Sequence, residues 1–192
     1  LNSLADQSYV FENAYVTQAV CSPARASIMT GLYPHTTGVI HINIPLLKET
    51  PAIAEMVSSD YLCGYIGKWH LGTGREFQPD RQGYDFSAVI GGPHLPGRYR
   101  VFSPSVQKPK PGQYRTEYEA DLCIDFVTKN KDKPFFMMLS PYAVHIPLGA
   151  MSAKVDKYTK RAAAAKRQLP HPVYAAMIEH CDDMVGRIVQ AV

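Results

Sequence analysis

Cys21 and Arg25 stand four residues apart in the segment 19–31, AVCSPARASIMTG. A predicted helix follows Cys21, so the thiol would lie at a helix N-terminus, where free backbone N–H groups and the helix dipole stabilise an anion. Arg25 would lie one turn further along the same face, and its planar guanidinium suits a tetrahedral oxyanion. This spacing indicates a nucleophile supported by a cation. The alternative, a buried structural thiol beside a surface arginine, is the commoner role of a lone cysteine.

A cysteine-dependent phosphatase also combines a thiolate with an arginine. Such an enzyme places a longer, glycine-rich loop between the two residues. Here three residues intervene, and one of them is Pro23. The segment therefore lacks the geometry of that class.

Two further segments carry side chains that could act on an anionic substrate. Lys68 and His70 stand two residues apart at the end of a predicted strand, so both could point to the same side. A cation neutralises negative charge there, while an imidazole moves protons. His145 follows another predicted strand by five residues, at the carboxyl edge where α/β folds build sites, and Pro147 stiffens its loop. Taken singly, each of these segments is more often structural.

Alternating strands and helices are predicted to position these residues. Ser22 is expected to cap the first helix, with Pro23 at its first position and Gly31 at its end, and Thr50 is expected to cap the second. We predict strands at 9–16, 61–67 and 134–140, the last a central strand covered on both sides, and helices at 22–30, 51–57, 118–128 and 173–192. This alternation indicates an α/β layered fold with a largely parallel sheet.

The last helix is predicted to be amphipathic, and a long loop is predicted at the middle of the chain. The helix would bury Met177, Ile178, Cys181, Met184, Val185 and Ile188. The segment 91–112 is rich in proline, glycine and basic residues, which predicts a long surface excursion. Its His94, Arg98 and Arg100 are candidates for substrate specificity, with solvated loop charge as the alternative.

Composition excludes several classes of protein. The 192 residues are 46% hydrophobic and 19% charged, with a formal net charge of +3. The sequence has no apolar run long enough to span a membrane. Basic residues in 154–167 lack the interleaved aromatics of a nucleic-acid platform and predict a solvated face. The four cysteines form no CxxC pair, which argues against a zinc knuckle or a disulfide framework, and Cys63, Cys123 and Cys181 are predicted to be buried.

Three segments together resemble the formylglycine-dependent (type I) sulfatases of the alkaline-phosphatase-like superfamily. Residues 19–31 resemble the first signature of that family, C-x-P-x-R, at every defining position, 64–70 resemble the second, and 144–147 resemble its later His-x-Pro element. The resemblance implies an alkaline-phosphatase-like layered fold with helices on both faces of the sheet. It also implies hydrolysis of a sulfate ester, on a sulfated sugar or an aryl sulfate.

The resemblance further implies a role for each motif residue. Cys21 would be oxidised by a maturation enzyme to formylglycine, whose hydrate, ionised by one bound Ca²⁺, would attack sulfur and also ligate the metal. A second hydroxyl of the hydrate would then expel sulfate. Arg25 and Lys68 would steady the nucleophile and the sulfate oxygens, His70 would be the base for the hydrate, and His145 would contact the leaving oxygen.

The acidic metal ligands of the family have no recognisable counterpart in this sequence. Asp6 matches a helical position, and Asp182 and Asp183 are expected on an exposed helical face. Residues 1–192 are therefore expected to be an incomplete catalytic domain, without the two metal-binding strands and the C-terminal subdomain. Two other functions stay open: a phosphonate monoester or phosphodiester hydrolase with the same machinery, and an inactive binding protein. The resemblance implies a periplasmic, secreted or lysosomal location and a saccharide or other small-molecule partner, with no nucleic acid.

Overall fold

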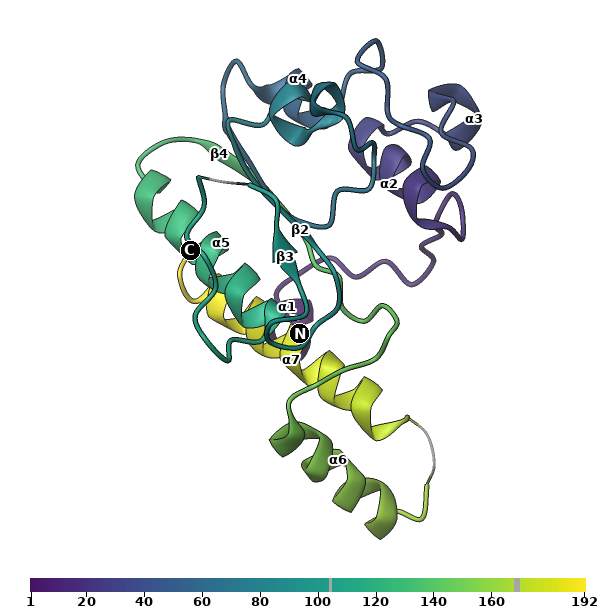
Figure 1. The fold of residues 1–192 in the computed structure, drawn as a ribbon, viewed down its shortest axis with the longest axis vertical. Helices are drawn as coiled ribbons and strands as arrows, with labels where there is room; N and C mark the ends of the chain where they lie inside the picture. The colour runs from purple at the N-terminus through teal and green to yellow at the C-terminus, as the bar shows by residue number, and fades with distance from the viewer. Residues whose placement is uncertain (104, 168–169) are drawn as a thin grey trace. The chain divides into compact units, whose positions relative to one another are not determined.

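A computed structural model describes residues 1–103, 105–167 and 170–192. Helices and strands are interspersed along the described chain, as the sequence predicts, but they do not alternate strictly: α1 to α4 all precede the first strand (Figure 1). The helices are α1 Asn2–Ala5, α2 Cys21–Thr30, α3 Pro34–Thr37, α4 Ile53–Val57, α5 Arg115–Asn130, α6 Ser152–Ala164 and α7 Pro172–Val189, with short 3-10 turns at Arg75–Phe77 and Pro79–Arg81. The strands are β1 Leu62–Gly67, β2 Phe86–Gly91, β3 Arg100–Val101 and β4 Phe135–Ser140.

The described chain divides into two compact units. Unit 1 contains Leu1–Tyr65, Trp69–Ser87 and Asp132–Met138, and unit 2 contains Ile66–Lys68, Ala88–Lys131 and Leu139–Val192. Strands β1, β2 and β4 each contribute residues to both units. Among the motif residues, Cys21, Arg25 and His70 belong to unit 1, whereas Lys68 and His145 belong to unit 2.

The strands of the described ranges form one sheet in the order β3-β2-β1-β4. The backbone N–H of Leu62 donates to Pro134 O at 3.0 Å and that of Lys68 donates to Ser140 O at 2.9 Å, so β1 and β4 run parallel. β3 pairs antiparallel with β2. The predicted strand at 61–67 is confirmed, and its last five residues are buried.

The interpretation of 134–140 as a central strand covered on both sides is wrong for this chain. In the part that the structure describes, β4 stands at the edge of the sheet, and all six of its residues are only half-buried. An apolar run shows that a strand can be buried, but its position in the sheet depends on pairing with distant segments. The run of residues alone therefore could not fix the strand order.

An aromatic cluster forms the centre of unit 1. The rings of Tyr65 and Trp69 meet edge-to-face with centroids 5.0 Å apart, and Tyr84 packs against both at 5.3 and 6.3 Å. The indole N–H of Trp69 donates to Phe77 O at 2.7 Å, which satisfies its polar group inside the core. Since Trp69 directly precedes His70 in unit 1, this cluster anchors the backbone beside that motif residue.

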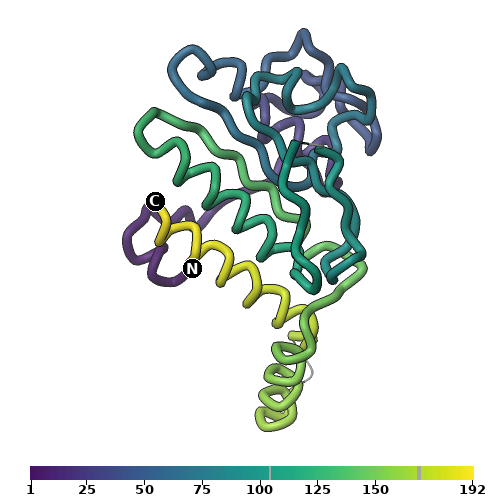
Figure 2. Tube along the Cα trace, turned by 60° about the vertical axis from the view of Figure 1, so that its left-hand side comes forward, coloured from purple at the N-terminus to yellow at the C-terminus, as the bar shows by residue number. Residues whose placement is uncertain are grey.

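Two helices, α5 and α7, lie side by side in unit 2 (Figures 1 and 2). The predicted helix at 118–128 is confirmed within α5, and Leu122, Phe126 and Val127 are buried as expected. The predicted buried face of the last helix is partly wrong, because Ile178 is 42% exposed whereas His180 is buried. Met177 and Met184 are buried as predicted, while Cys181, Val185 and Ile188 are half-buried.

The basic segment 154–167 lies mostly in α6, which packs against α7. Lys154 donates to Glu179 at 3.0 Å and also contacts Asp183, and Lys157 donates to Glu179 at 2.7 Å. The lysines of this exposed helix therefore join α6 to α7. These ion pairs lower the pKa of Glu179 to about 2, chiefly through the hydrogen bond from Lys157.

Several predicted element boundaries differ from the structure. α2 begins at Cys21, so Val20 and not Ser22 is the N-cap, and Pro23 falls inside the first turn. Gly31, at φ 72°, ends the helix as predicted. α4 begins later than predicted, and its entry is held by the backbone N–H of Ala52, which donates to the Glu55 carboxylate at 2.9 Å.

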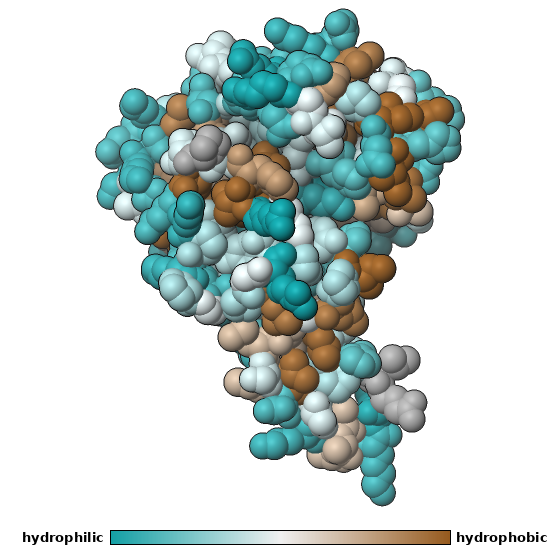
Figure 3. Space-filling view, in the orientation of Figure 1, coloured by the Kyte–Doolittle hydropathy of each residue, from teal (hydrophilic) through white to brown (hydrophobic). Residues whose placement is uncertain are grey.

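The predicted strand at 9–16 is wrong, because these residues form no strand and are exposed. Tyr9, Phe11 and Tyr15 are each more than 80% exposed. A strand needs backbone hydrogen bonds to a neighbour, and β propensity alone does not supply them. Figure 3 also shows apolar side chains on the surface over the α2–α3 region, and the exposed apolar residues of this part of the chain include Ile28, Leu32, Tyr33, Ile40 and Ile42.

Candidate active site

The first motif places Cys21 as the first residue of a ten-residue helix. Val20 is extended at φ −112° and ψ 155°, so the chain turns into α2 at the thiol itself. Cys21 and Arg25 are both half-buried and lie one helical turn apart. The N-terminal position puts residue 21 near the positive end of the helix dipole, and Arg25 adds a full positive charge on the same side. An oxyanion at residue 21 would be stabilised by both.

The other cysteines differ from Cys21 in their surroundings. Cys63 and Cys123 are buried as predicted, while Cys181 is half-buried on α7. Burial raises the pKa of Cys123 and of Cys181 to about 11, so both thiols stay protonated at neutral pH. None of the four cysteines is in a disulfide. Burial makes Cys63, Cys123 and Cys181 unsuited to nucleophilic chemistry.

Asn43 connects His70 with the start of α2, all within unit 1. Its backbone N–H donates to Ser22 Oγ at 3.4 Å, and its side-chain Oδ1 lies 3.3 Å from His70 Nε2. Asn43 and His70 both have left-handed backbones, at φ 68° and 62°. Such backbone angles are uncommon for non-glycine residues and persist where surrounding contacts impose them. Sequence reasoning missed Asn43, for which the known tolerance of asparagine for positive φ was the only signal.

The expectation that Lys68 and His70 follow strand alternation is wrong. β1 ends at Gly67, whose φ of 114° takes the chain out of the extended region, and a Cβ there would overlap the carbonyl oxygen of Ser140. Only glycine allows this close approach. Beyond it, Lys68 Nζ lies 5.3 Å from the ring centroid of Tyr142, whereas His70 contacts Asn43. The two motif residues therefore have different neighbours.

As the sequence predicts, His145 lies in the loop after β4. It belongs to unit 2. Its ring stacks on that of Tyr142 with centroids 4.5 Å apart and an interplanar angle of 28°. Its backbone N–H donates to Tyr142 O at 2.9 Å, and its carbonyl oxygen accepts a hydrogen bond from His94 Nε2 at 2.7 Å. Both the ring and the backbone of His145 are thus held in place.

His94 is fully buried, so the alternative of solvated loop charge is wrong for this residue. Arg98 and Arg100 are exposed. Burial lowers the pKa of His94, which favours the neutral imidazole, with its one proton on the Nε2 that donates to His145. Tyr99 is also buried, so the predicted surface excursion at 91–112 is partly a core segment. Residue 104 of that loop lies outside the described residues.

A fully buried ion pair supports the same region of unit 2. Arg115 Nε donates to Glu119 at 2.8 Å, and both side chains are 0% exposed. The other guanidinium nitrogens of Arg115 donate to Ile90 O at 2.9 Å and to Gly92 O. Burial raises the pKa of Glu119, and the adjacent Arg115 opposes that rise. Sequence reasoning missed this pair, since a charged i,i+4 pair usually indicates an exposed helical face.

The described residues do not supply a recognisable metal site. Within the described ranges, no group of three or more His, Cys, Asp or Glu side chains could hold a metal ion. Asp182 and Asp183 are exposed on α7, as expected, and Asp183 contacts Lys154. Ca²⁺ prefers six or more oxygen ligands, so Asp182 and Asp183 do not fit such an ion.

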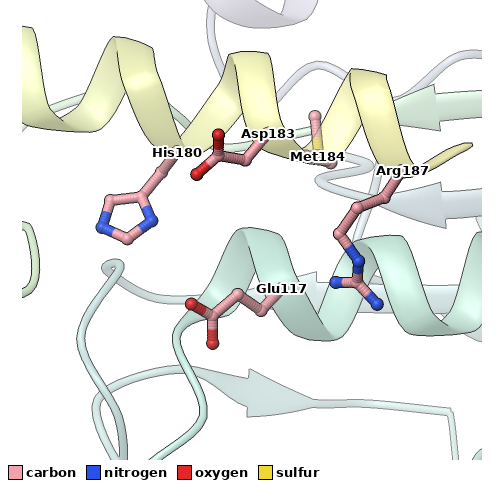
Figure 4. Close-up of a pocket in the computed structure, with 5 residues that line it drawn as sticks. All are labelled: Glu117, His180, Asp183, Met184 and Arg187. Atoms are coloured by element: carbon pink, nitrogen blue, oxygen red, sulfur yellow. The ribbon is translucent and has the colours of Figure 1, made fainter.

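A cavity of about 210 Å³ lies between α5 and α7 (Figure 4). Glu117 projects into it from α5, and the remaining lining residues, His180, Asp183, Met184 and Arg187, project from α7. Burial lowers the pKa of His180 to about 4. None of the motif residues lines this cavity, so the cavity and the candidate site share no residue.

Comparison with known proteins identifies a family for the whole chain. The family model described as Sulfatase matches residues 1–192. The chain is 31% identical over 169 residues to an ulvan-active sulfatase of Formosa agariphila, and 27% identical over 214 residues to arylsulfatase J of Mus musculus. These matches cover 83% and 100% of this chain, but 33% and 35% of the relatives. The chain thus spans about a third of the length of these curated relatives.

Solved structures show the same fold. The chain matches the crystal structure of Ps i-CgsB in complex with k-i-k-neocarrahexaose with a TM-score of 0.78 and 25% identity, over 92% of this chain and 45% of that one. A Bacteroides thetaiotaomicron structure, BT33494S-sulf, matches with a TM-score of 0.74 at 18% identity, over 94% of this chain and 47% of that one. These matches confirm the predicted alkaline-phosphatase-like α/β fold with a mostly parallel sheet.

Among the described helices, none combines the length and the apolar character that crossing a membrane requires.

Proposed function

The chain belongs to the sulfatase family, and on this basis we propose that the protein hydrolyses sulfate esters with residue 21 as its nucleophile. The observation that carries the proposal is the position of Cys21 as the first residue of α2, one turn before Arg25, within the C-x-P-x-R pattern. The family match over residues 1–192 supports it. The reaction proposed is the cleavage of the ester and the release of sulfate.

The proposed substrate class is a sulfated saccharide. Relatives carry the names ulvan-active sulfatase and N-acetylglucosamine-6-O-sulfatase, and a solved neighbour holds a neocarrahexaose. The chain is 28% identical to the second of these relatives, over 76% of its own length. Arylsulfatase J, another relative, makes aryl sulfates the alternative substrate. The exposed Arg98 and Arg100 remain candidates for contacts with the saccharide.

We propose that Cys21 acts after conversion to formylglycine by a maturation enzyme. The hydrate of that aldehyde would supply two hydroxyl groups, one to attack sulfur and one to release sulfate from the enzyme. The other residues of the chain would stabilise the charge that develops on this group. The N-terminus of α2 and the guanidinium of Arg25 stabilise negative charge at residue 21, and such preorganised charge is usually the largest catalytic contribution.

The remaining motif residues have roles consistent with their contacts. His70 is the proposed base, and the contact of its Nε2 with Asn43 Oδ1 fixes the orientation of the ring. Lys68 is proposed to neutralise the sulfate oxygens. His145 is proposed to contact the leaving oxygen of the ester. We further propose that residues 1–192 form part of a larger catalytic domain, whose other segments bind Ca²⁺, in a periplasmic, secreted or lysosomal protein.

Turnover by the full-length protein tests this proposal. The substrates are p-nitrophenyl sulfate, a 6-O-sulfated N-acetylhexosamine, bis-p-nitrophenyl phosphate and a phosphonate monoester. We expect faster turnover of the sulfate esters, and loss of at least about 10³-fold in kcat on Cys21→Ala. Cys181→Ala, which removes a protonated thiol from α7, is the matched control and keeps the wild-type rate. Preferential turnover of the phosphodiester, or activity that survives Cys21→Ala, would contradict the proposal.

A further inference from the structure

Tyr142 contacts two of the predicted substrate-binding residues at once. Lys68 Nζ lies 5.3 Å from the centroid of its ring, and the His145 ring stacks on it at 4.5 Å. The Cζ atom of Arg115 lies 4.8 Å from the same centroid, and the ring of His94 lies 5.1 Å away. All of these residues belong to unit 2, and Tyr142 is the residue that they share.

We propose that Tyr142 is a positioning residue, whose ring sets the places of the Lys68 ammonium and the His145 imidazole for binding of the sulfate group. This inference rests on the proposed function, in which Lys68 and His145 contact the ester. Tyr142 itself need not touch the substrate. The face of an aromatic ring attracts a cation within about 6 Å of its centroid, and a stacked imidazole gains from the same surface.

The ring can act in this way because it is itself fixed. Its hydroxyl donates to Ile146 O at 3.1 Å, and its carbonyl oxygen accepts from the backbone N–H of His145, so the loop closes on itself. Arg115, on the other hand, is fully buried and is held by Glu119 and by two backbone carbonyls. Since Arg115 cannot reach solvent or a ligand, its contact with the ring serves to hold Tyr142.

His94 fixes the backbone of the same loop from a different element. Its Nε2–H donates to His145 O at 2.7 Å, and the backbone N–H of Arg115 donates to His94 O at 3.1 Å. The start of α5 is thereby connected through His94 to the loop that carries His145. The ring of Tyr142 and the imidazole of His94 therefore constrain His145 at its side chain and its main chain, respectively.

Two substitutions distinguish the contribution of the Tyr142 ring from that of its hydroxyl group. Tyr142→Phe removes the hydrogen bond to Ile146 but keeps the aromatic face and its contact with the buried Arg115, which still holds the ring. We therefore expect kcat/KM for a sulfate ester to stay within about threefold of wild type. Tyr142→Leu removes the face, and we expect kcat/KM to fall by about 10- to 100-fold. The KM and the Ki of inorganic sulfate, a product inhibitor, should rise together, because the contact between the ring and the Lys68 ammonium is lost.

Tyr158→Leu on α6 is the matched control. Tyr158 also has two cations over its ring, Lys157 at 5.3 Å and Arg161 at 5.6 Å, but it contacts no motif residue in the described chain. Its loss should leave KM and Ki unchanged. Thermal unfolding followed by circular dichroism compares the stability of all variants. A purely structural effect would reduce the fraction of active enzyme, and therefore kcat, without changing the Ki of sulfate.

The outcomes distinguish this inference from the proposed function. If wild type hydrolyses sulfate esters and Tyr142→Leu leaves KM and Ki unchanged, or Tyr142→Phe is as impaired as Tyr142→Leu, the positioning role of the ring is refuted. If wild type turns over no sulfate ester, the proposed function fails. Calorimetric titration with inorganic sulfate then decides the inference: weaker binding in Tyr142→Leu than in wild type supports it, and equal or undetectable binding in both overturns it.

Discussion

The buried pair of Arg115 and Glu119 on α5 leads to a quantitative prediction of stability. Arg115→Met removes the guanidinium, leaves the Glu119 carboxylate without its partner at 0% exposure, and frees the acceptors Ile90 O and Gly92 O. Removing one member of a buried ion pair costs about 3–5 kcal/mol, because a charge is left uncompensated. We therefore expect the free energy of unfolding to fall by that amount at pH 8.

The pH dependence of this loss follows from the raised pKa of Glu119. At pH 5 the stranded carboxyl can take up a proton and become neutral, so the deficit of Arg115→Met relative to wild type should be smaller than at pH 8. Adding Glu119→Leu removes the carboxyl altogether. The double variant should be less destabilised than the sum of the two single variants by about 1–3 kcal/mol.

Urea unfolding of the full-length protein, followed by circular dichroism at both pH values, measures these differences. Lys129→Met is the matched control, since Lys129 and Asp125 form another i,i+4 pair on α5 at 2.7 Å with side chains 68% and 56% exposed. Exposed helical pairs of this kind contribute about 0.5 kcal/mol. A deficit for Arg115→Met as small as that of Lys129→Met would refute the reasoning from burial.

Two further predictions concern His180 and Asn43. The pKa of His180 is lowered by burial to about 4, against an ordinary value of 6.5, so unfolding takes up a proton between these values and stability should fall as the pH decreases from 6.5 towards 4. This residue's share of the slope is at most about 1.4 kcal/mol per pH unit, and His180→Leu should remove it; an unchanged slope in urea unfolding would contradict the assignment. Asn43→Gly keeps the left-handed backbone at 43 but loses the contact with His70, so kcat should fall about 10-fold with stability little changed, and an unaltered kcat would exclude Asn43 from orienting the ring.

Local sequence patterns were sufficient to predict the elements whose ends and faces depend on neighbouring residues. Gly31 ends α2 because it adopts φ 72°, which a glycine does without strain. The apolar run of β1 and the helical spacing of α5 likewise predict these two elements. The start of α2 was misplaced by one residue, a difference within the usual uncertainty of helix ends, and it left the position of Cys21 at the helix N-terminus unchanged.

Features that depend on contacts between distant segments could not be predicted in this way. Arg115 is 23 residues from Gly92 and 25 from Ile90, so nothing in its local sequence shows that it is fully buried. Asn43 meets His70 across 27 residues, and His94 meets His145 across 51. The predicted buried face of α7 is likewise wrong at Ile178, which is exposed, and at His180, which is buried. The ring of His180 stacks on that of Tyr114 with centroids 4.1 Å apart, and this contact turns the His180 side of the helix towards the core.

The chemical state of residue 21 tests the central claim most directly. Protein from a host that contains the maturation enzyme is digested, and the peptide ending at Arg25 is examined by mass spectrometry after treatment with an aminooxy reagent and, separately, with iodoacetamide. We predict an aldehyde at position 21 that reacts with the aminooxy reagent and resists alkylation. An active protein whose residue 21 is an unmodified, alkylatable cysteine would contradict the account.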